Sequence, residues 1–274
     1  MIGLREYKYP NLGQWVIRIE GNDVMFTHFQ CNNEQSLLSI ISPAYNESKN
    51  LPALVNKLLE ATRKFNINAE IIIVNDGSTD DTAEAAKRLA EKFEEVRVIH
   101  HERNLGKTRA TYSGIQIAQG EYVMLFESDL QYESYDIPKF IPLMRLNYDV
   151  INGYRKFRMD PLHRTLLSKF YNMTLRFLFG IQVYDANSGL KAFKREIALR
   201  LFNPTFIDQI GINIRDYHRV CLVIANWLGH TIDEVTVRHY RRKQGKSYIT
   251  LKTPFSTLRT ILKLKFYFWF RKLP

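Results

Sequence analysis

From residue 37 onward, short apolar runs alternate with stretches in which apolar residues recur at helical spacing. The runs Leu37–Ile41, Ala69–Val74, Val96–His100 and Tyr122–Phe126 are short enough to be buried strands. Between the first two runs, the apolar residues of Leu51–Leu59 recur every three to four positions, which predicts an amphipathic helix. Strands that alternate with helices predict right-handed βαβ units, and therefore an α/β fold with a mostly parallel sheet covered on both faces.

Both ends of the chain depart from this pattern. The first residues predict an N-terminal appendage in which Gln14–Glu20 and Val24–His28 form a β-hairpin. The predicted domains are residues 1–36, the appendage; residues 37–250, the α/β domain; and residues 251–274, a basic amphipathic helix. Later in the α/β domain, the pattern predicts helices at 138–144, 162–179 and 214–228 and strands at 149–153 and 231–237.

Three polar loops follow strands of the predicted sheet, around Asn46, Asp76 and Asp129. Ligands of open parallel sheets bind beyond the carboxyl ends of the strands, so we expect these loops to form one site. The third loop carries Glu127, Asp129 and Gln131 at alternate positions, and these side chains share one side if the extended conformation persists. Such oxygen ligands suit Mg²⁺ or Mn²⁺ shared with a phosphate, or they form only a solvated strand-to-turn junction.

The composition indicates a globular protein whose positively charged surface attracts anions. The 274 residues are 45% hydrophobic, and 39 Lys and Arg stand against 28 Asp and Glu, a formal net charge of +11. Such a surface attracts phosphorylated substrates, anionic lipid headgroups or nucleic acid. Cys31 and Cys221 are the two cysteines of the chain and neither has a second Cys at metal-site spacing, which argues against a zinc site and a disulfide framework and for a cytoplasmic setting. We expect no signal peptide and no transmembrane segment in the chain.

Six motifs occur together in an order that resembles the family-2 inverting glycosyltransferases with the GT-A fold. They are Pro43-Ala44-Tyr45-Asn46-Glu47, Val74-Asn75-Asp76-Gly77-Ser78, Asn104-Leu105-Gly106-Lys107, Ser128-Asp129-Leu130-Gln131, Asn187-Ser188-Gly189-Leu190-Lys191 and Arg242-Lys243-Gln244-Gly245-Lys246-Ser247. Within the family, the chain is most similar to the dolichyl-phosphate mannosyltransferase and polyprenyl-phosphate glycosyltransferase group. The resemblance implies a Rossmann-like GT-A domain with a mostly parallel central sheet flanked by helices, and it leaves the N-terminal appendage outside.

The resemblance implies a nucleotide-sugar donor, with GDP-mannose favoured and a UDP-hexose as the alternative. Asp76 would accept a hydrogen bond from an N–H of the base, and Glu47 would lie near the ribose or base. Glu47 could equally be an acid that the dipole favours at a helix N-terminus. Lys107 and the amides around Gly106 would lie by the nucleotide, or Lys107 is a solvated residue at a helix start. The other implied donor residues are Pro43, Tyr45, Ser128, Asp129, Arg242 and Lys246.

The resemblance also implies a bound Mn²⁺ or Mg²⁺ with Glu127, Asp129 and Gln131 as ligands. Asp129 and Gln131 match the acid and the amide of the family motif. Glu127 stands where the group usually has Asp, and it is one methylene longer, so its contact with the metal is direct, mediated by water, or absent. A metal on the diphosphate would neutralise charge on the leaving nucleotide.

The acceptor is implied to be a polyprenyl phosphate. Arg155, Arg164 and Ser168 match positions that contact phosphates in this group, and an Arg guanidinium suits such contacts because it offers a bidentate fork. Each single Arg could also be surface charge. The basic loop Arg242–Lys246 could close over the diphosphate as a lid.

The mechanism depends on the acceptor. A lipid phosphate is already an anion and needs no strong general base, whereas a sugar hydroxyl needs one. Asp185, Asp208 and Asp216 are the acids of the acceptor half, and Asp185 either positions other groups or is a turn-forming residue. The residues implied in catalysis are Asp129, Arg155, Arg164 and Asp185. The alternatives are transfer to a glycan hydroxyl and a nucleotide-sugar-binding protein with weak catalysis, the latter suggested by Glu127.

Two predicted helices carry interleaved basic and bulky apolar side chains. In Pro254–Phe270, an apolar face with Trp and Phe lies beside a basic face, as in helices of a bilayer interface. Leu162–Phe179 has a similar pattern, although both helices could simply pack on the domain. We therefore expect a peripheral protein on the cytoplasmic face of a membrane, with a membrane-anchoring partner as one possibility. We expect no nucleic-acid partner, because no nucleic-acid-binding motif occurs.

Overall fold

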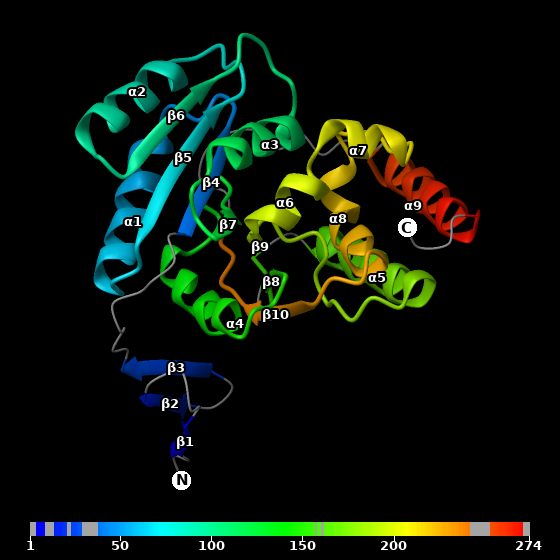
Figure 1. The fold of residues 1–274 in the computed structure, drawn as a ribbon, viewed down its shortest axis with the longest axis horizontal. Coiled ribbons are helices and arrows are strands. Elements are labelled where there is room, and N and C mark those ends of the chain that lie inside the picture. Colours follow the sequence, from blue (N-terminus) through cyan, green and yellow to red (C-terminus); the bar gives the residue numbers. More distant parts are fainter. Residues whose placement is uncertain are drawn as a thin grey trace.

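The computed structural model describes residues 4–8, 14–20, 23–28, 38–156, 158–159, 162–241 and 253–270. These residues form a three-stranded sheet, and a seven-stranded sheet with helices on both faces (Figure 1). The small sheet consists of β1 (Leu4–Lys8), β2 (Gln14–Glu20) and β3 (Asp23–His28), paired antiparallel in that order. The predicted hairpin is confirmed as β2 and β3. The pattern missed β1, because its five residues mix charged and apolar side chains without a clear period.

The large sheet has the strand order β10-β8-β9-β7-β4-β5-β6. Its strands are β4 (Leu38–Ala44), β5 (Ala69–Asn75), β6 (Val96–His100), β7 (Tyr122–Leu125), β8 (Val150–Tyr154), β9 (Lys191–Lys194) and β10 (Ile232–Thr236). Strand β9 runs antiparallel to β7 and β8, and every other neighbouring pair is parallel. The segment that leads into β9 therefore lies at the edge where β7 and β8 end, which is the edge of the predicted site.

Strand β4 extends further than the sequence predicts. The apolar run that predicts this strand ends at Ile41, but Ser42, Pro43 and Ala44 still pair with β5. The pairing of β4 with β7 ends at Ile41, opposite Leu125. Beyond that point β4 has β5 as its neighbour in the sheet, so the missing N–H of Pro43 breaks no ladder on the β7 side.

Alternate residues of the central strands divide between two hydrophobic layers. Ile40 and Met124 face the layer of α1 (Leu51–Lys64), α2 (Thr82–Lys92) and η1 (Ser134–Phe140). Ile41 and Val123 face the layer of α3 (Lys107–Ile117), α5 (Leu162–Phe179), α6 (Arg195–Leu201) and α8 (Tyr217–Trp227). The mostly parallel, doubly covered sheet is thus confirmed.

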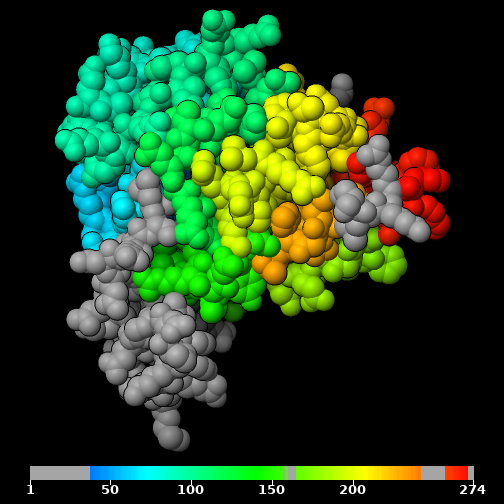
Figure 2. Space-filling view, viewed as in Figure 1, coloured from blue at the N-terminus to red at the C-terminus, as the bar shows by residue number. Residues whose placement is uncertain are grey.

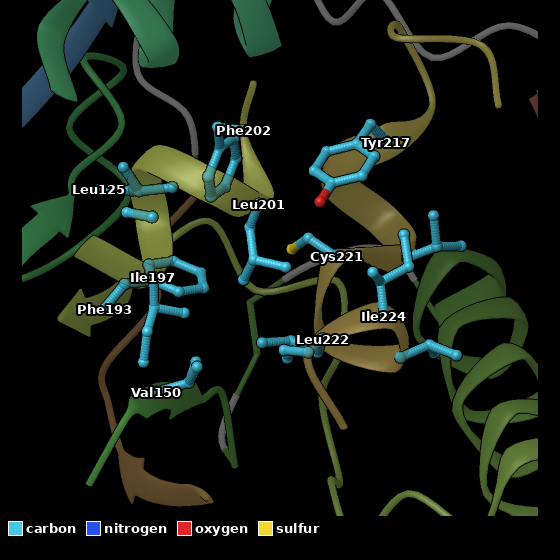
Figure 3. Packing of buried hydrophobic residues seen from close by; sticks show 14 of the residues in the cluster. Leu125, Val150, Phe193, Ile197, Leu201, Phe202, Tyr217, Cys221, Leu222 and Ile224 are labelled. Atoms are coloured by element: carbon cyan, nitrogen blue, oxygen red, sulfur yellow. The ribbon is translucent and has the colours of Figure 1, made fainter. Parts of the chain in front are cut away.

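The layer that contains α3, α5, α6 and α8 includes a row of aromatic side chains packed edge to face. Phe193 of β9, Phe202 and Tyr217 follow one another with ring centroids 5.4 and 5.6 Å apart in edge-to-face geometry (Figure 3). This chain of rings joins β9 to α8 through the turn after α6. Helix α6 and helix α7 (Pro204–Gln209) were not predicted, because they span only two turns and carry little periodic signal.

Helices α4 (Ile141–Arg145) and α9 (Thr253–Phe270) complete the described elements. The predicted C-terminal helix is confirmed as α9, which lies at the same end of the molecule as α5 (Figure 2). Among the described helices, none has both the length and the hydropathy needed to cross a bilayer.

Candidate functional site

The carboxyl ends of β4, β5 and β7 form one polar edge. The loops after β4 and β5 are joined there, because the Asn46 N–H donates to Ser78 Oγ at 2.9 Å and Asn46 Oδ1 accepts the Thr79 N–H at 2.8 Å. The Ser128 hydroxyl, from the loop after β7, donates to the carbonyl of Pro43 at 3.0 Å. The structure thus brings the three polar loops together, as the sheet topology predicts.

Asp76 follows β5 directly, is buried, and holds the start of α3. Its Oδ1 accepts the Leu105 N–H at 2.9 Å and lies 2.8 Å from His101 Nδ1, while Oδ2 accepts the Gly106 N–H at 2.9 Å. A carboxylate only accepts, so His101 carries a proton on Nδ1, and its Nε2 lies 2.9 Å from Ser113 Oγ of α3. These contacts use three of the roughly four acceptor positions of the carboxylate. The remaining position belongs to Oδ2.

Glu47 lies at the beginning of α1. Its backbone carbonyl accepts the N–H groups of Asn50 and Leu51, and its own N–H donates to Thr82 Oγ1 at 2.9 Å. The carboxylate accepts the side-chain amide of Asn50. These bonds give Glu47 a role at the helix start, and its contact with a nucleotide stays a prediction. Tyr45, in the same loop, is half-buried.

The acidic stretch does not continue as a strand. Strand β7 ends at Leu125, and Leu130 has a φ of 60°, so the chain turns between Ser128 and Leu130. The expectation that Glu127, Asp129 and Gln131 share one side of an extended segment is therefore wrong. The turn instead places the Gln131 N–H 3.2 Å from Asp129 Oδ1.

Glu127 lies between the donor-side and acceptor-side loops. Its Oε1 accepts the ammonium of Lys107, the first residue of α3. Its carboxyl group rests on Gly189, where an added Cβ would lie 2.2 Å from Glu127 Cδ. Burial alone would raise the pKa of Glu127, but Lys107, Arg155 and His239 outweigh burial and lower the pKa to about 2. Glu127 is therefore a carboxylate at neutral pH.

The turn after β7 fits a divalent cation that is shared with a substrate. Asp129 offers a carboxylate, and Gln131 donates its amide N–H to the Tyr240 carbonyl at 2.9 Å, which leaves its amide oxygen as an acceptor. Among the described residues, no three His, Cys, Asp or Glu side chains cluster closely enough to hold a metal ion by themselves. Two oxygen ligands from the protein suit a Mg²⁺ or Mn²⁺ that takes its other ligands from a diphosphate and water.

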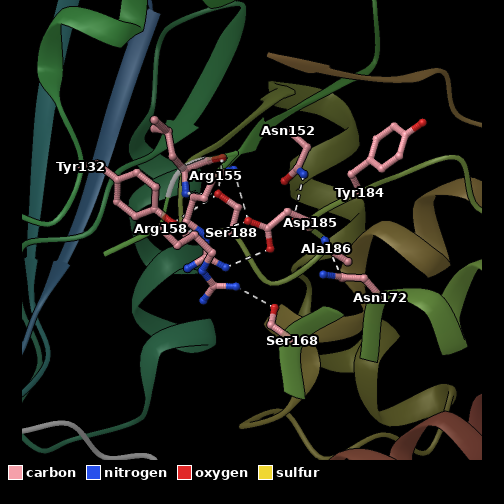
Figure 4. Close-up of polar contacts among 12 residues, drawn as sticks. Tyr132, Asn152, Arg155, Arg158, Ser168, Asn172, Tyr184, Asp185, Ala186 and Ser188 are labelled. Carbon is pink, nitrogen blue, oxygen red and sulfur yellow. Dashed lines mark hydrogen bonds and ion pairs between the residues drawn. The ribbon is translucent and has the colours of Figure 1, made fainter. Parts of the chain in front are cut away.

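Arg155 and Asp185 form a buried, bidentate ion pair. Arg155 Nε lies 2.7 Å from Asp185 Oδ2, and Nη2 lies 2.9 Å from Oδ1 (Figure 4). The two side chains are only 8% and 4% exposed. Burial alone would raise the pKa of Asp185, but the Arg155 guanidinium outweighs it and lowers the pKa below its ordinary value. Asn152 of β8 fixes the segment by donating its amide to the Asp185 carbonyl at 3.0 Å.

Arg158 is a residue of this site that the sequence analysis missed. Its Nη1 donates to Ser168 Oγ of α5 at 2.7 Å, so it lies beside one of the residues for which the family resemblance implies a phosphate contact (Figure 4). The signal was available, because Arg158 lies three residues after Arg155. Arg164 belongs to α5, but its side chain, like Arg242 and Lys246, lies outside the described residues.

Lys191 is a second missed residue, at the end of the motif that begins at Asn187. It is buried, and its ammonium donates to the Ser188 carbonyl. Burial is the main cause that lowers the pKa of Lys191, to about 8. The next peptide N–H, that of Gly189, donates to the Tyr132 hydroxyl at 2.6 Å. Lys191 and Tyr132 together fix the backbone on which Glu127 rests.

Helices α5 and α9 pack together and expose apolar side chains. Lys265 donates to the Leu178 carbonyl at 2.7 Å, and the rings of Phe179 and Phe268 lie 5.7 Å apart. We call the exposed residues the α5–α9 surface: Leu166, Leu167, Phe170, Met173, Phe177, Leu258, Leu262, Phe266, Trp269 and Phe270, each more than half exposed. Neither helix contains an acidic residue.

Residues 39–202 match the family model described as Glycosyl transferase family 2. The chain belongs to this family. Among its relatives is the undecaprenyl-phosphate 4-deoxy-4-formamido-L-arabinose transferase of Pectobacterium atrosepticum, which is 32% identical over 215 residues, 77% of this chain and 62% of the relative. A putative glycosyltransferase of Bacillus subtilis is 30% identical over 225 residues, 82% of this chain and 64% of the relative. The chain thus spans less than two thirds of the length of these relatives.

Solved structures of two sugar-transferring or sugar-phosphate enzymes have a similar fold. A mannosyltransferase of Pyrobaculum calidifontis, in complex with GDP-Man and Mn²⁺, superposes with a TM-score of 0.58 at 18% identity, covering 88% of this chain and 67% of that one. Glucosyl-3-phosphoglycerate synthase of Mycobacterium tuberculosis, in complex with Mn²⁺, UDP-glucose and glycerol 3-phosphate, gives 0.55 at 18% identity, with 86% and 82% coverage. The predicted GT-A-type fold is confirmed.

Proposed function

We propose that this family 2 chain transfers a sugar, expected to be a hexose, from a nucleotide sugar to a polyprenyl phosphate, with inversion and with Mn²⁺ or Mg²⁺. One observation carries the proposal. The buried Arg155–Asp185 pair, with Arg158 and Ser168 beside it, gathers two guanidinium groups on the edge that also carries Asp129, and such a group suits a phosphate. The name of the Pectobacterium relative, an undecaprenyl-phosphate transferase, supports the lipid phosphate.

In this mechanism, Arg155 and Arg158 hold the acceptor phosphate. Asp185 uses two of the five N–H donors of the Arg155 guanidinium and so orients the others. A phosphate oxygen attacks the anomeric carbon opposite the diphosphate, and the carbon–oxygen bond to the diphosphate breaks with its electron pair leaving on the nucleoside diphosphate. Asp129 and Gln131 would hold the metal, which supplies positive charge to that leaving group.

The acids of the acceptor half are poor candidates for a general base. Asp185 is paired with Arg155, which lowers its pKa, and Asp216 accepts from Arg219 at 2.8 Å. Asp208 lies exposed on α7. A sugar hydroxyl would need a base, whereas a phosphate anion does not. The geometry therefore favours the lipid phosphate over a glycan hydroxyl.

The contacts of Asp76 favour the UDP-sugar among the two donors that the sequence suggests. Both acceptor positions of Oδ1 are in use, so a ligand finds one position, on Oδ2. Uracil presents a single N–H donor on its pairing edge, whereas guanine presents an N–H and an amino group that need both carboxylate oxygens. We therefore expect a UDP-sugar to be used in preference to GDP-mannose.

A donor panel tests the proposal. The protein, undecaprenyl or dolichyl phosphate and Mn²⁺ are incubated with UDP- and GDP-linked hexoses and with UDP-linked 4-deoxy-4-formamido-L-arabinose, the sugar in the name of the Pectobacterium relative. Lipid-linked sugar is measured by mass spectrometry. We expect a chelator-sensitive product from a UDP-sugar. No lipid-linked product from any donor would refute the function, and a product from GDP-mannose alone would refute only the choice of base.

We further propose that the α5–α9 surface holds the protein on the cytoplasmic face of a membrane, either alone or with a membrane-anchoring partner. Its apolar residues recur along each helix as one stripe, and Lys169, Arg176, Arg259 and Lys263 lie in the same helices without any acid. Apolar side chains beside basic ones suit the interface of an anionic bilayer. This placement would bring the acceptor headgroup to Ser168 on α5.

Vesicle sedimentation tests the surface. Phe177 and Trp269 are 88% and 78% exposed, so Phe177→Glu and Trp269→Glu should leave the fold intact. We expect each change to weaken binding to phosphatidylglycerol vesicles by about tenfold, from lost apolar burial and added repulsion. The control is Leu146→Glu, at a residue 50% exposed outside both helices. Equal binding by all three variants and the unchanged protein would contradict the proposal.

A further inference from the structure

Glu127 stands where elements from both halves of the site meet. Lys107 comes from the start of α3 on the donor side, and Gly189 comes from the segment before β9 on the acceptor side. The Glu127 carboxyl group contacts both, through an ion pair with Lys107 and close packing on the Gly189 backbone. Glu127 therefore joins two segments that are more than 80 residues apart in the sequence.

The backbone at Gly189 leaves room for a glutamate side chain at position 127, which is one methylene longer than an aspartate. A Cβ on residue 189 would lie 2.2 to 2.6 Å from the carboxyl atoms of Glu127, so the carboxylate can rest there only above a glycine. Tyr132 and Lys191 fix this backbone through Gly189 N–H and the Ser188 carbonyl. An aspartate would end about 1.5 Å short, the length of one carbon–carbon bond.

The carboxylate in turn fixes the Lys107 ammonium at a helix N-terminus. Lys107 opens α3, an 11-residue helix, and Gly106 before it has a φ of 90° and donates its N–H to Asp76. A helix N-terminus attracts phosphate groups. An ammonium has three donors, and Glu127 uses one of them, which leaves donors for oxygens of a diphosphate.

We propose that Glu127 is a positioning residue that holds the Lys107 ammonium as a fixed cation for the donor diphosphate, and that it does not ligate the metal. The metal would then be held by Asp129 and Gln131, as the proposed function has it, and the inference rests on that function. Part of the diphosphate affinity would come from Lys107 and would persist when no divalent cation is present.

Calorimetric titration with UDP, in EDTA and in Mn²⁺, tests the proposal. We expect the unchanged protein to bind UDP in EDTA, and Glu127→Gln and Lys107→Met each to weaken that binding by about tenfold. The double variant should lose no more than either single variant, because one interaction is removed in all three. Gly189→Ala, which displaces the carboxylate without changing any charge, should reproduce Glu127→Gln. Glu91→Gln, on the exposed side of α2, is the matched control.

Electron paramagnetic resonance of Mn²⁺ in the presence of UDP separates the two roles of the acids. We expect Glu127→Gln to keep the bound Mn²⁺ and Asp129→Asn to lose it. Three results would overturn the proposal. The first is that Glu127→Gln loses the bound Mn²⁺. The others are that the unchanged protein binds no UDP in EDTA, or that Glu127→Gln binds UDP in EDTA as tightly as the unchanged protein does. If the unchanged protein binds no nucleoside diphosphate even with Mn²⁺, the proposed function fails as well.

Discussion

Replacing Asp185 with alanine is expected to lower the free energy of unfolding by about 3–5 kcal/mol, because the change leaves the Arg155 guanidinium buried without its carboxylate. Both side chains are less than a tenth exposed, and the pair makes two short, parallel hydrogen bonds. Chemical denaturation followed by circular dichroism measures the effect. The control is Glu95→Ala, which breaks the exposed pair with Arg63 and should cost less than about 1 kcal/mol.

The double variant Arg155→Met/Asp185→Leu separates stability from function. Replacing a buried ion pair with apolar residues of similar size is often neutral or stabilising, so we expect it to recover most of the lost stability. It should nevertheless transfer no sugar, because it lacks the guanidinium that we propose binds the acceptor phosphate. Recovery of both stability and transfer would show that the pair serves only the fold.

The Arg155–Asp185 pair also makes the free energy of unfolding depend on pH. The pKa of Asp185 is lower in the folded protein than in the unfolded chain, so its contribution is fully present above the unfolded value of about 3.9 and is lost as the pH falls through the folded value. We expect the unchanged protein to lose stability relative to the double variant, which lacks Asp185, only as the pH falls below about 4.

Replacing Asp129 with alanine is expected to lower the rate of transfer by about 10²–10³-fold, the usual cost of removing one preorganised electrostatic contact to a leaving group. Asp129 lies in the turn after β7, where its Oδ1 accepts the Gln131 N–H, and the proposed function makes its carboxylate a ligand of the metal on the diphosphate. Steady-state kinetics at saturating donor measure the loss.

Two controls accompany this variant. Asp81→Ala removes an exposed carboxylate before α2 that makes no capping hydrogen bond, and it should leave the rate unchanged. The thermal unfolding of Asp129→Ala is measured in parallel, so that a loss of stability is not taken for a loss of transfer. A transfer rate within threefold of the unchanged protein would mean that the leaving group is stabilised without Asp129.

The sequence predicted the donor half of the fold well, because its strands are mostly apolar and its helices amphipathic. Ile71 to Val74 have no polar residue among them, and the run matches β5. The acceptor half was harder to predict for a physical reason. Strand β9 has only four residues, two of them lysines, and its place between β7 and β8 is decided by long-range pairing rather than by local pattern.

The residues of the site also divide into those that the sequence could predict and those that it could not. Motif spacing was sufficient to single out Asp76, Asp129 and Arg155, which lie on the expected edge of the sheet. It could not show that Asp76 is already held by three donors of its own chain, since two of these are backbone groups. Nor could it show the partner of Glu127, because an ion pair with Lys107 over Gly189 exists only once α3 and the segment before β9 have come together.

Transfer to undecaprenyl phosphate, compared in parallel with undecaprenol and a soluble saccharide, is the decisive measurement. With a radiolabelled nucleotide sugar and Mn²⁺, we predict that label enters the organic phase with the lipid phosphate and with neither other acceptor. The reason is that the proposed function has the arginines bind a phosphate, and that none of the described acids Asp185, Asp208 and Asp216 is placed to activate a hydroxyl. Equal labelling of the alcohol or of the soluble saccharide would contradict this account of the site.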